Sequence, residues 1–272
     1  MEAEQTDALM GFDRTLPNEA RLIDYLMGGK DNFAADRAAA EEVLKIAPEL
    51  PMMIREGRKF LGRAVRYLAS EGVRQYIDIG CGLPTQGSVH QILQAVAPQS
   101  RVVYVDLDPV VIAHSNALID TRGMNRVVRA DVREPDALLD HPSIATFIDL
   151  RQPTAIVLKD VIASIPEDDI VTMISRRLVD RMAPGSYLLF SHAVSDVSPA
   201  VTEDLARVFQ ESQVIDGDRP DVRTTEEVRR FMDGLELLPP GLVPLPAWRP
   251  GPGEPSVDPT TFWGLGAIAR KP

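Results

Sequence analysis

The segment Gln75-Tyr-Ile-Asp-Ile-Gly-Cys-Gly-Leu-Pro-Thr85 indicates the fold of this 272-residue chain. Its first five residues, Gln75–Ile79, form a short run rich in Ile and Tyr, typical of a strand buried on both faces of a parallel sheet. The glycines at 80 and 82 let the backbone turn sharply, and a helix is predicted over Gly87–Ala97. A strand, a glycine turn and a helix in this order indicate an α/β protein whose ligand lies at the carboxyl end of the strand.

The same alternation of strand and helix continues toward the C-terminus. Short runs rich in Val, Ile, Leu and Tyr are separated by helical stretches, which predicts right-handed βαβ units and a doubly wound sheet. No helix fits between the last two runs, so these should pair antiparallel. The candidate strands are Gln75–Ile79, Arg101–Asp106, Arg126–Ala130, Ala155–Lys159, Ser186–His192, Leu235–Leu238, Leu242–Leu245 and Phe262–Ala269.

The region before this pattern has no strand signal. An amphipathic stretch begins near Pro17 and stops at Gly28-Gly29, because glycine adopts the left-handed cap conformation at little cost. Two further helices are predicted, over Ala34–Ile46 and from near Pro51 to Gly72. We therefore expect a helical cap over residues 1–72 and an α/β domain over residues 73–272.

Composition argues against several classes of function. Forty acidic residues against 29 basic ones give a net charge of −11, and this field repels nucleic acid. No apolar run is long enough to span a membrane and no signal peptide is visible, so we expect a cytoplasmic location. One cysteine and four scattered histidines predict neither a disulfide nor a metal site. Arg55, Arg58, Arg63 and Arg66 could bind a small anion, but a solvated helix face is the favoured interpretation.

Acidic residues follow the second and third predicted strands. Asp106 ends the second strand about twenty residues after the glycine turn, where an acid can accept hydrogen bonds from both hydroxyls of a ribose. Asp108 is the alternative at this strand end, although we expect it to cap the helix that begins at Pro109. Asp131 follows the third strand and could accept a hydrogen bond from the amine of adenine. These positions predict a nucleoside bound across the strand ends.

The glycine turn does not fit a pyrophosphate. A dinucleotide-binding fingerprint needs a third glycine at the start of the helix, but Pro84 and Thr85 stand in that region. The sequence also lacks the glycine-rich loop that holds a triphosphate. Contacts for ribose and adenine without a phosphate cradle favour S-adenosylmethionine over NAD or ATP. Asp78, ahead of the glycines, could then face the ammonium group of this ligand, directly or through water.

The predicted cofactor site has further members at the fourth strand end and in the cap. Lys159 and Asp160 are expected beside the opposite face of the ligand. In the cap, Tyr25 or Asn32 is expected to touch the methionine end and Phe33 to shield it from water, although a helix stop and cap would also explain this turn. The full set is Tyr25, Gly28, Asn32, Phe33, Asp78, Gly80, Gly82, Pro84, Asp106, Leu107, Asp131, Val132, Lys159 and Asp160.

The motif Asp78-x-Gly-x-Gly82, followed by Asp106 and Asp131, resembles class I S-adenosylmethionine-dependent methyltransferases. This resemblance implies a Rossmann-like, doubly wound sheet of seven strands, mostly parallel with an antiparallel last strand. It also implies that S-adenosylmethionine is the cofactor.

A narrower resemblance extends over nearly the whole chain. Ala20–Arg37, Ile79–Thr85, Val103–Pro109 and the closing Trp248-Arg-Pro250 are similar to an actinobacterial family of methyltransferases formerly described as a domain of unknown function. Two positions depart from the family pattern. Asp160-Val-Ile-Ala-Ser164 stands where a run ending in Leu-His is frequent, and Gly57 stands where Asn is usual.

The resemblance implies methyl transfer by in-line displacement, for which the protein mainly aligns the reactants and excludes water. His192, at the end of the fifth predicted strand, is the candidate general base, with a structural role as the alternative. We expect a small-molecule acceptor, because acidity disfavours nucleic acid and a cap would restrict access. Other hypotheses are a non-catalytic S-adenosylmethionine-binding regulator and, less in keeping with the missing glycine, a nicotinamide-dependent oxidoreductase.

Overall fold

The computed structural model of the chain describes residues 13–84, 87–214, 222–251, 253, 258 and 261–272. Parallel strands form the centre of one sheet, and the residues of β1, β4 and β5 are almost all buried, as the apolar runs predicted. These strands are β1 (Gln75–Ile79), β2 (Arg101–Asp106), β3 (Asn125–Arg129), β4 (Ala155–Lys159) and β5 (Tyr187–Ala193).

The closing strands are antiparallel. β8 (Gly264–Arg270) lies between β5 and β6 (Glu236–Leu237), which gives the strand order β3-β2-β1-β4-β5-β8-β6. A second two-residue strand, β7 (Val243–Pro244), also pairs with β8. β6 and β7 are shorter than predicted, because prolines next to or within them lack the N–H group that a longer ladder needs. The order and directions confirm the predicted fold class.

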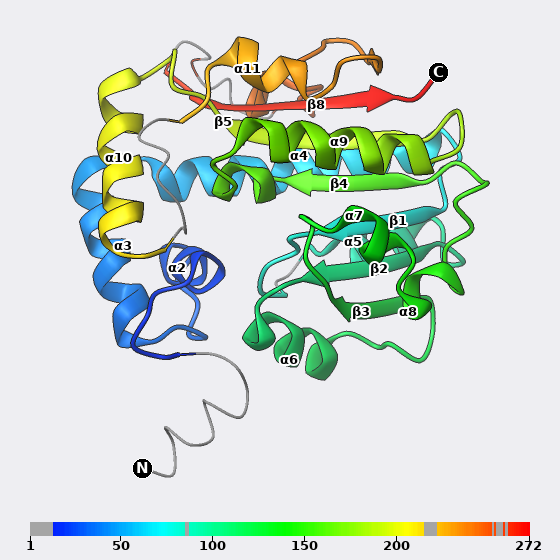
Figure 1. Ribbon diagram of the computed structural model, residues 1–272, viewed down its shortest axis with the longest axis horizontal. Coiled ribbons are helices and arrows are strands. Elements are labelled where there is room, and N and C mark those ends of the chain that lie inside the picture. The colour runs from blue at the N-terminus through cyan, green and yellow to red at the C-terminus, as the bar shows by residue number, and fades with distance from the viewer. Residues whose placement is uncertain (1–12, 85–86, 215–221, 252, 254–257, 259–260) are drawn as a thin grey trace.

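Helices cover both faces of the sheet (Figure 1). One apolar core joins one sheet face to α3 (Ala34–Ile46), α4 (Leu50–Ser70), α5 (Val89–Val96) and α10 (Pro199–Glu211). A second core joins the other face to α7 (Pro135–Leu139), α8 (Pro142–Ala145), α9 (Asp168–Arg181) and α11 (Thr225–Arg230). α6 (Pro109–Leu118) follows β2. A helical pattern over Pro135–Leu150 predicts one helix broken at Pro142, and α7 and α8 are separated there because proline cannot continue the hydrogen-bond ladder of a helix.

The N-terminal helices, which we call the cap, pack against the sheet and share an apolar core with it. α2 (Glu19–Leu26) lies beside the carboxyl ends of the parallel strands (Figure 1), while α4 runs along the sheet. Arg63 on α4 donates hydrogen bonds to the backbone oxygens of Leu245 and Trp248, at 2.7 and 2.9 Å. Trp248 is fully buried against Phe60 of α4, so the cap is fastened to the C-terminal part of the chain. Within the described residues, no helix is both long and apolar enough to cross a membrane.

The register of the sheet brings several strand ends together. Ile79, the last residue of β1, lies opposite Val105 of β2 and Leu158 of β4. Asp106 lies opposite Arg129 at the end of β3. The turns after these four strands therefore meet at one edge of the sheet, next to α2.

Candidate active site

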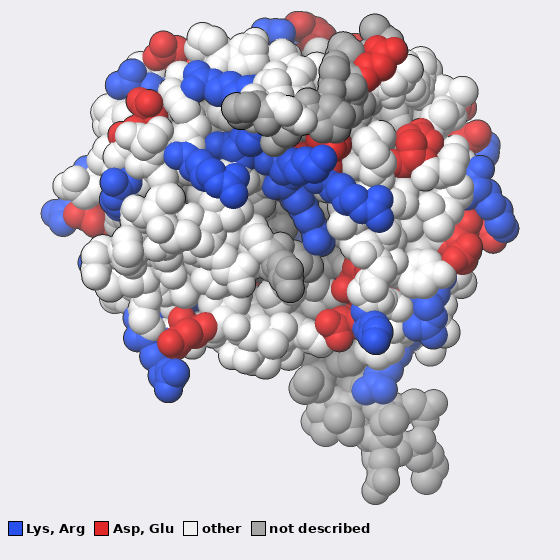
Figure 2. Space-filling view, turned by 180° about the vertical axis from the view of Figure 1, so that it is seen from behind, with Lys and Arg blue, Asp and Glu red and all other residues white. Residues whose placement is uncertain are grey.

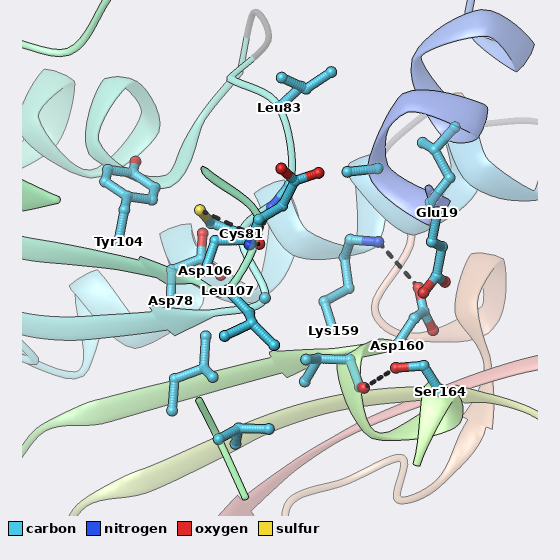
Figure 3. A pocket seen from close by; sticks show the side chains of 18 of the residues that line it. Glu19, Asp78, Cys81, Leu83, Tyr104, Asp106, Leu107, Lys159, Asp160 and Ser164 are labelled. Atoms are coloured by element: carbon cyan, nitrogen blue, oxygen red, sulfur yellow. Dashed lines mark hydrogen bonds and ion pairs between the residues drawn. The ribbon is translucent and has the colours of Figure 1, made fainter. Parts of the chain in front are cut away.

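A cavity of about 560 Å³ lies at this edge, between the strand ends and the cap. Its walls come from the turn after β1, the ends of β2, β3 and β4, η1 (Val161–Ser164), and the helices α2 and α4. Figure 3 shows α2 across the cavity from Asp78 and Tyr104. The volume falls in the range of about 300–1,000 Å³ that is usual for small-molecule sites.

The residues predicted at the strand ends meet in this cavity. The cavity lining includes two glycines, one proline, two apolar residues that follow acids, and five charged residues. They are Asp78, Gly80, Gly82, Pro84, Asp106, Leu107, Asp131, Val132, Lys159 and Asp160.

The glycine turn is held tightly against neighbouring elements. Gly80 has φ +68°, and a Cβ atom there would lie only 2.4 Å from Cγ2 of Val161 in η1. Its N–H donates to the backbone oxygen of Val105 at 2.8 Å. Gly82 has φ +66°, but a Cβ atom there would meet no atom within 4 Å. Only glycine satisfies the contact and the conformation at position 80, so the turn exposes bare backbone to the cavity.

Asp106 closes the turn from the β2 side. Its two carboxylate oxygens accept hydrogen bonds from the N–H groups of Gly82, at 2.9 Å, and Asp108, at 3.0 Å. Burial raises the pKa of Asp106 above its ordinary value, and these N–H groups oppose the rise. A carboxylate has about four acceptor positions, so Asp106 can accept further hydrogen bonds from a ligand in the cavity.

Asp78, on β1 beneath the turn, is only 7% exposed, and no described residue pairs with its carboxylate. Burial raises its pKa from 3.8 to about 7, with a further contribution from the negative charge of Asp106 and opposition from Lys159. A buried carboxyl group without a partner favours its neutral form until a positive group approaches it. Asp78 is therefore prepared for a cationic ligand group.

Lys159 and Asp160 form an ion pair at the end of β4. Nζ of Lys159 lies 3.0 Å from Oδ2 of Asp160, and Oγ of Ser191 donates to Oδ1 at 2.8 Å. Burial acts against the charge of Lys159, but the carboxylates of Asp160 and Asp78 outweigh it and raise the pKa overall. Asp160 has φ +62°, a conformation that costs free energy for any residue other than glycine. The contacts with Lys159 and Ser191 hold the Asp160 carboxylate at the cavity wall.

Glu19, the first residue of α2, lines the cavity and points toward Asp160 on the same side of it (Figure 3). No hydrogen bond or ion pair joins its carboxylate to the described residues. Burial raises the pKa of Glu19 from 4.5 to about 7, and the negative charge of Asp160 adds to this rise. The carboxylate of Asp160 disfavours the charge of Glu19, so Glu19 can hold a proton at this wall.

Asp131 lies at the end of β3 and pairs with its own neighbour. Nε and NH2 of Arg133 donate to the Asp131 carboxylate at 2.6–3.0 Å. Burial acts to raise the pKa of Asp131, but the hydrogen bonds and charge of Arg133 lower it overall. Ala130 and Val132 line the cavity on either side, which gives this end an apolar surface beside a carboxylate.

Comparison with known proteins places this chain in a family. A model of the S-adenosyl methyltransferase family matches residues 5–272. The chain belongs to this family. The match confirms the predicted family and the class of enzyme, and it favours a methyltransferase over a nicotinamide-dependent oxidoreductase.

Two crystal structures are similar to the chain over nearly its whole length. One is a protein of the DUF574 family from Streptomyces avermitilis, 36% identical over 96% of this chain and 99% of its own, with a TM-score of 0.89. The other, from Thermobifida fusca, is described as a candidate methyltransferase. It is 40% identical over 96% of this chain and 97% of its own, with a TM-score of 0.87. No curated protein matches the chain.

The cap residues that the sequence assigned to the cofactor do not line the cavity of this family member. The hydroxyl of Tyr25 donates to Glu41 at 2.5 Å, and Nδ2 of Asn32 donates to Asp24 at 2.8 Å. The Phe33 ring lies under Arg21, 5.3 Å from the guanidinium carbon. Gly28 is exposed at the end of α2. Side-chain partners within the cap hold this turn.

Asp24 is the acid at the centre of that turn, and it does line the cavity. Its carboxylate accepts hydrogen bonds from the N–H of Asp31, at 2.8 Å, and from Asn32. A Cβ atom on Gly29 would lie 2.0 Å from Oδ1 of Asp24, so the turn can close around the carboxylate only with glycine at this position. The Gly28–Asn32 turn therefore positions Asp24.

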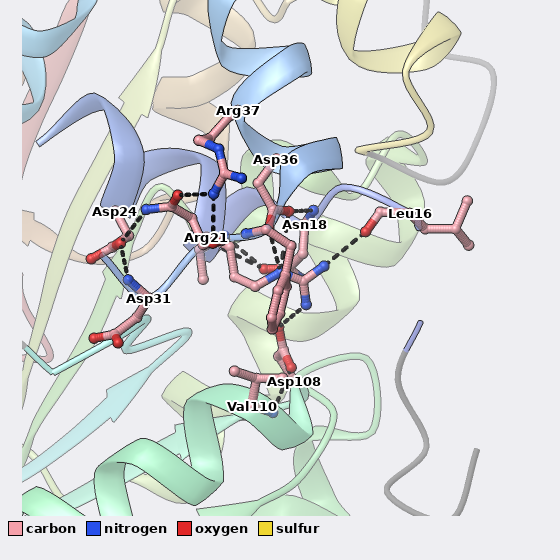
Figure 4. A network of polar contacts seen from close by, with 12 residues as sticks. Leu16, Asn18, Arg21, Asp24, Asp31, Asp36, Arg37, Asp108 and Val110 are labelled. Carbon is pink, nitrogen blue, oxygen red and sulfur yellow. Dashed lines mark hydrogen bonds and ion pairs between the residues drawn. The ribbon is translucent and has the colours of Figure 1, made fainter. Parts of the chain in front are cut away.

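A buried network joins the cap to the loop after β2 (Figure 4). Arg21 of α2 is 3% exposed, and its Nε lies 2.9 Å from the fully buried carboxylate of Asp36 on α3. Its NH1 lies 3.6 Å from Oδ2 of Asp108. Asp108 also accepts a hydrogen bond from the N–H of Val110 at 2.7 Å, which is the predicted helix cap. Arg21 thus holds α2 beside the loop that follows Asp106.

His192 is 1% exposed and does not line the cavity. Its ring stacks on Phe190, with centroids 6.2 Å apart, and its Nδ1 contacts the backbone oxygen of Ala193. Its Nε2 lies 3.4 Å from the buried guanidinium of Arg223. A general base must reach its proton donor, so this position supports the structural alternative for His192.

Glu19, Asp24 and Arg58 line the cavity without having been predicted to do so. All three belong to cap helices. Glu19 and Asp24 are accompanied by Ala20 and Ile23, a spacing that marks one face of α2. That spacing was visible in the sequence, but nothing indicated that this face would meet the sheet.

Proposed function

We propose that the protein transfers a methyl group from S-adenosylmethionine to a small-molecule acceptor in this cavity. Asp106 carries the proposal, because its carboxylate lies beside the glycine turn and keeps free acceptor positions toward the cavity. Hydrogen bonds from two ribose hydroxyls would use those positions. Membership of the S-adenosyl methyltransferase family supports the choice of cofactor.

The other lining residues suit the remaining parts of the same cofactor. Asp131, with Leu107 and Val132, would hold the adenine through a carboxylate and two apolar contacts. Asp78 would face the ammonium group, which supplies the positive partner that its carboxylate lacks. Gly80 and Gly82, followed by Pro84, would let the cofactor approach the backbone, and Lys159 with Asp160 would flank its reactive side.

When bound, the cofactor supplies a methyl group that a positive sulfur has already activated for displacement. The protein then has to align the acceptor and exclude water. Glu19 is the residue placed to accept the proton that a hydroxyl or amine acceptor loses, because it lines the cavity and its pKa of about 7 suits proton transfer near neutral pH. The acidic lining and the nearby α2 favour a small acceptor over nucleic acid.

Calorimetry with S-adenosylmethionine, S-adenosylhomocysteine and NAD tests the cofactor. At one hundred times its dissociation constant, either adenosyl ligand should stabilise the protein by about 2.7 kcal/mol, while NAD should give no shift. Stabilisation by NAD alone would overturn the proposal.

A screen of small amines, phenols and carboxylic acids for release of S-adenosylhomocysteine tests the acceptor. Cofactor binding without turnover of any acceptor would favour the non-catalytic regulator instead. For an acceptor that is turned over, Glu19→Gln should lower kcat and remove the rise of kcat between pH 6 and 8. An unchanged pH profile would exclude Glu19 as the base.

A further inference from the structure

Basic side chains gather in a band beside a hollow on the face that α4 covers (Figure 2). The basic residues of α4 have different surroundings. Arg55 and Arg66 are exposed, as a solvated helix face requires, and Arg63 donates to backbone oxygens near the C-terminus. Arg58 is half-buried and lines the cavity.

Arg58 differs from the other basic residues that line the cavity, Lys159 and Arg133. Lys159 pairs with Asp160, and Arg133 pairs with Asp131. Across the described ranges of the chain, no hydrogen bond, ion pair or ring contact involves the guanidinium of Arg58. It is the cation of this cavity that lacks a partner among the described residues.

Burying a guanidinium without an anion is unfavourable. Burial lowers the pKa of Arg58, and the carboxylate of Asp24 opposes this only through its charge, because Asp24 is already bonded to the turn around it. The planar fork of donors on arginine matches the two oxygens of a carboxylate. The expected partner of Arg58 is therefore a carboxylate that this chain does not supply.

Two features indicate which end of a ligand lies there. The charge of Arg58 acts on Lys159, at the end of β4, so the two side chains line the same part of the cavity. Asp78, which also acts on Lys159, is a buried acid without a partner among the described residues. A cation and an anion that both line this cavity and both lack a partner among the described residues fit a group that carries both charges, as the α-amino acid end of a molecule does.

We propose that Arg58 binds the carboxylate of the methionine end of the cofactor, while Asp78 binds its ammonium group. This inference rests on the proposed function. The carboxylate is the only anionic group of S-adenosylmethionine, and Arg58 is the lining cation that has no partner among the described residues. The pair would make the site selective for nucleosides that carry the amino acid, against nucleosides that lack it.

The test compares S-adenosylhomocysteine with 5′-methylthioadenosine, which has the same nucleoside and sulfur but no amino acid end. Arg58→Gln should weaken the affinity for S-adenosylhomocysteine, measured by calorimetry, on the order of 30-fold, because it removes a charge-assisted bidentate contact. The affinity for 5′-methylthioadenosine should stay unchanged. The affinity of Arg58→Lys for S-adenosylhomocysteine should lie between those of wild type and Arg58→Gln, because lysine keeps the charge but lacks the planar pair of donors.

Arg55→Gln is the matched control, since Arg55 is exposed one turn earlier on the same helix and does not line the cavity. It should change neither affinity. Thermal unfolding should show little loss of stability in Arg58→Gln, because no hydrogen bond or ion pair with a described residue is removed.

The other possible results distinguish failure of the Arg58 assignment from failure of the proposed function. If wild-type protein does not bind S-adenosylhomocysteine, the proposed function fails. If wild type binds it and Arg58→Gln binds it equally well, the role of Arg58 is overturned. Equal loss of affinity for both nucleosides would also overturn this role, because it would indicate general damage to the site. If only a carboxylate-bearing acceptor binds more weakly to the variant, the anion belongs to the acceptor and the assignment to the cofactor is wrong.

Discussion

Two glycine turns are predicted to contact the cofactor, but only the turn after β1 lines the cavity. Gly80–Gly82 follows a central parallel strand, so the topology of the sheet places it beside the ends of β2 and β4. Gly28-Gly29 follows a helix of the cap and closes around the carboxylate of Asp24. The location of a turn can be predicted from the sequence when the sheet topology determines it. It cannot be predicted when contacts between side chains determine it.

The sharpest test of this comparison is the contact at Gly80. Gly80→Ala should lower the free energy of unfolding by about 4 kcal/mol, because it combines an unfavourable positive φ with a clash against Val161. Gly82→Ala, with a similar φ and open space around it, should lose only about 1 kcal/mol. Urea denaturation measures both. Equal losses would mean that backbone conformation alone, and not the approach of η1, requires glycine.

The next effect concerns the ribose contact that we propose for the first turn. Asp106→Ala should weaken binding of S-adenosylhomocysteine on the order of a hundredfold, because it removes the charged acceptor. Calorimetry measures the change, with the exposed Asp120→Ala as control. An affinity within threefold of wild type would show that Asp106 does not bind the cofactor. The main difference that we draw between the two turns would then be wrong.

In the second turn, substitution should affect stability more than cofactor binding. Gly29→Ala should lower the free energy of unfolding by about 2 kcal/mol, because its Cβ would displace the Asp24 carboxylate. Gly28→Ala, at φ +80° with open space, should lose about 1 kcal/mol. Binding of S-adenosylhomocysteine to Gly29→Ala should weaken less than in Asp106→Ala. A greater loss would show that the cap turn, too, acts on the cofactor.

The pH dependence is the smallest expected effect. Asp78 and Glu19 have pKa values of about 7 in the folded protein, against 3.8 and 4.5 ordinarily. Between these values the folded protein holds protons that the unfolded chain has released, so these groups make stability fall as pH rises from about 4 to 7. Asp78→Asn should remove its part of this fall, visible as a higher melting temperature than wild type at pH 8.

Ligand binding should change with pH in the opposite direction. A cationic group binds the ionised form of Asp78, so affinity for S-adenosylhomocysteine should rise about tenfold from pH 6 to pH 8. In Asp78→Asn the affinity should be weaker and nearly independent of pH. A wild-type affinity that falls over this range would contradict the pairing of Asp78 with the ammonium group.

Much of the fold and part of the candidate site follow from the sequence for one physical reason. Parallel strands in register end at one edge, so Asp78, Asp106 and Asp160 meet there whatever the loops do. The cap is different, because its placement depends on single contacts between distant residues. Arg21 reaches both Asp36 and Asp108, and no periodicity indicates that pairing.

The same limit explains the errors within the cap. α2 turns one face to the cavity, and a residue on the neighbouring position of a helix points about 100° away. Tyr25 therefore bonds to Glu41 while Asp24 lines the cavity. His192 belongs to the end of a strand, yet its side chain packs beside Arg223 and away from the cavity. The strand end could be predicted, but not the direction of the side chain.

The apolar core shared by the cap and the sheet has a consequence for how such proteins diversify. Leu22, Val43 and Phe60 from the cap lie in one cluster with Tyr76 and Ile268 from the sheet. A cap built into the core in this way cannot be exchanged as a module without exposing apolar surface on both pieces. Relatives with different acceptors would then arise by point substitutions on the cavity face of α2, and a library confined to that face is where directed evolution of acceptor choice should begin.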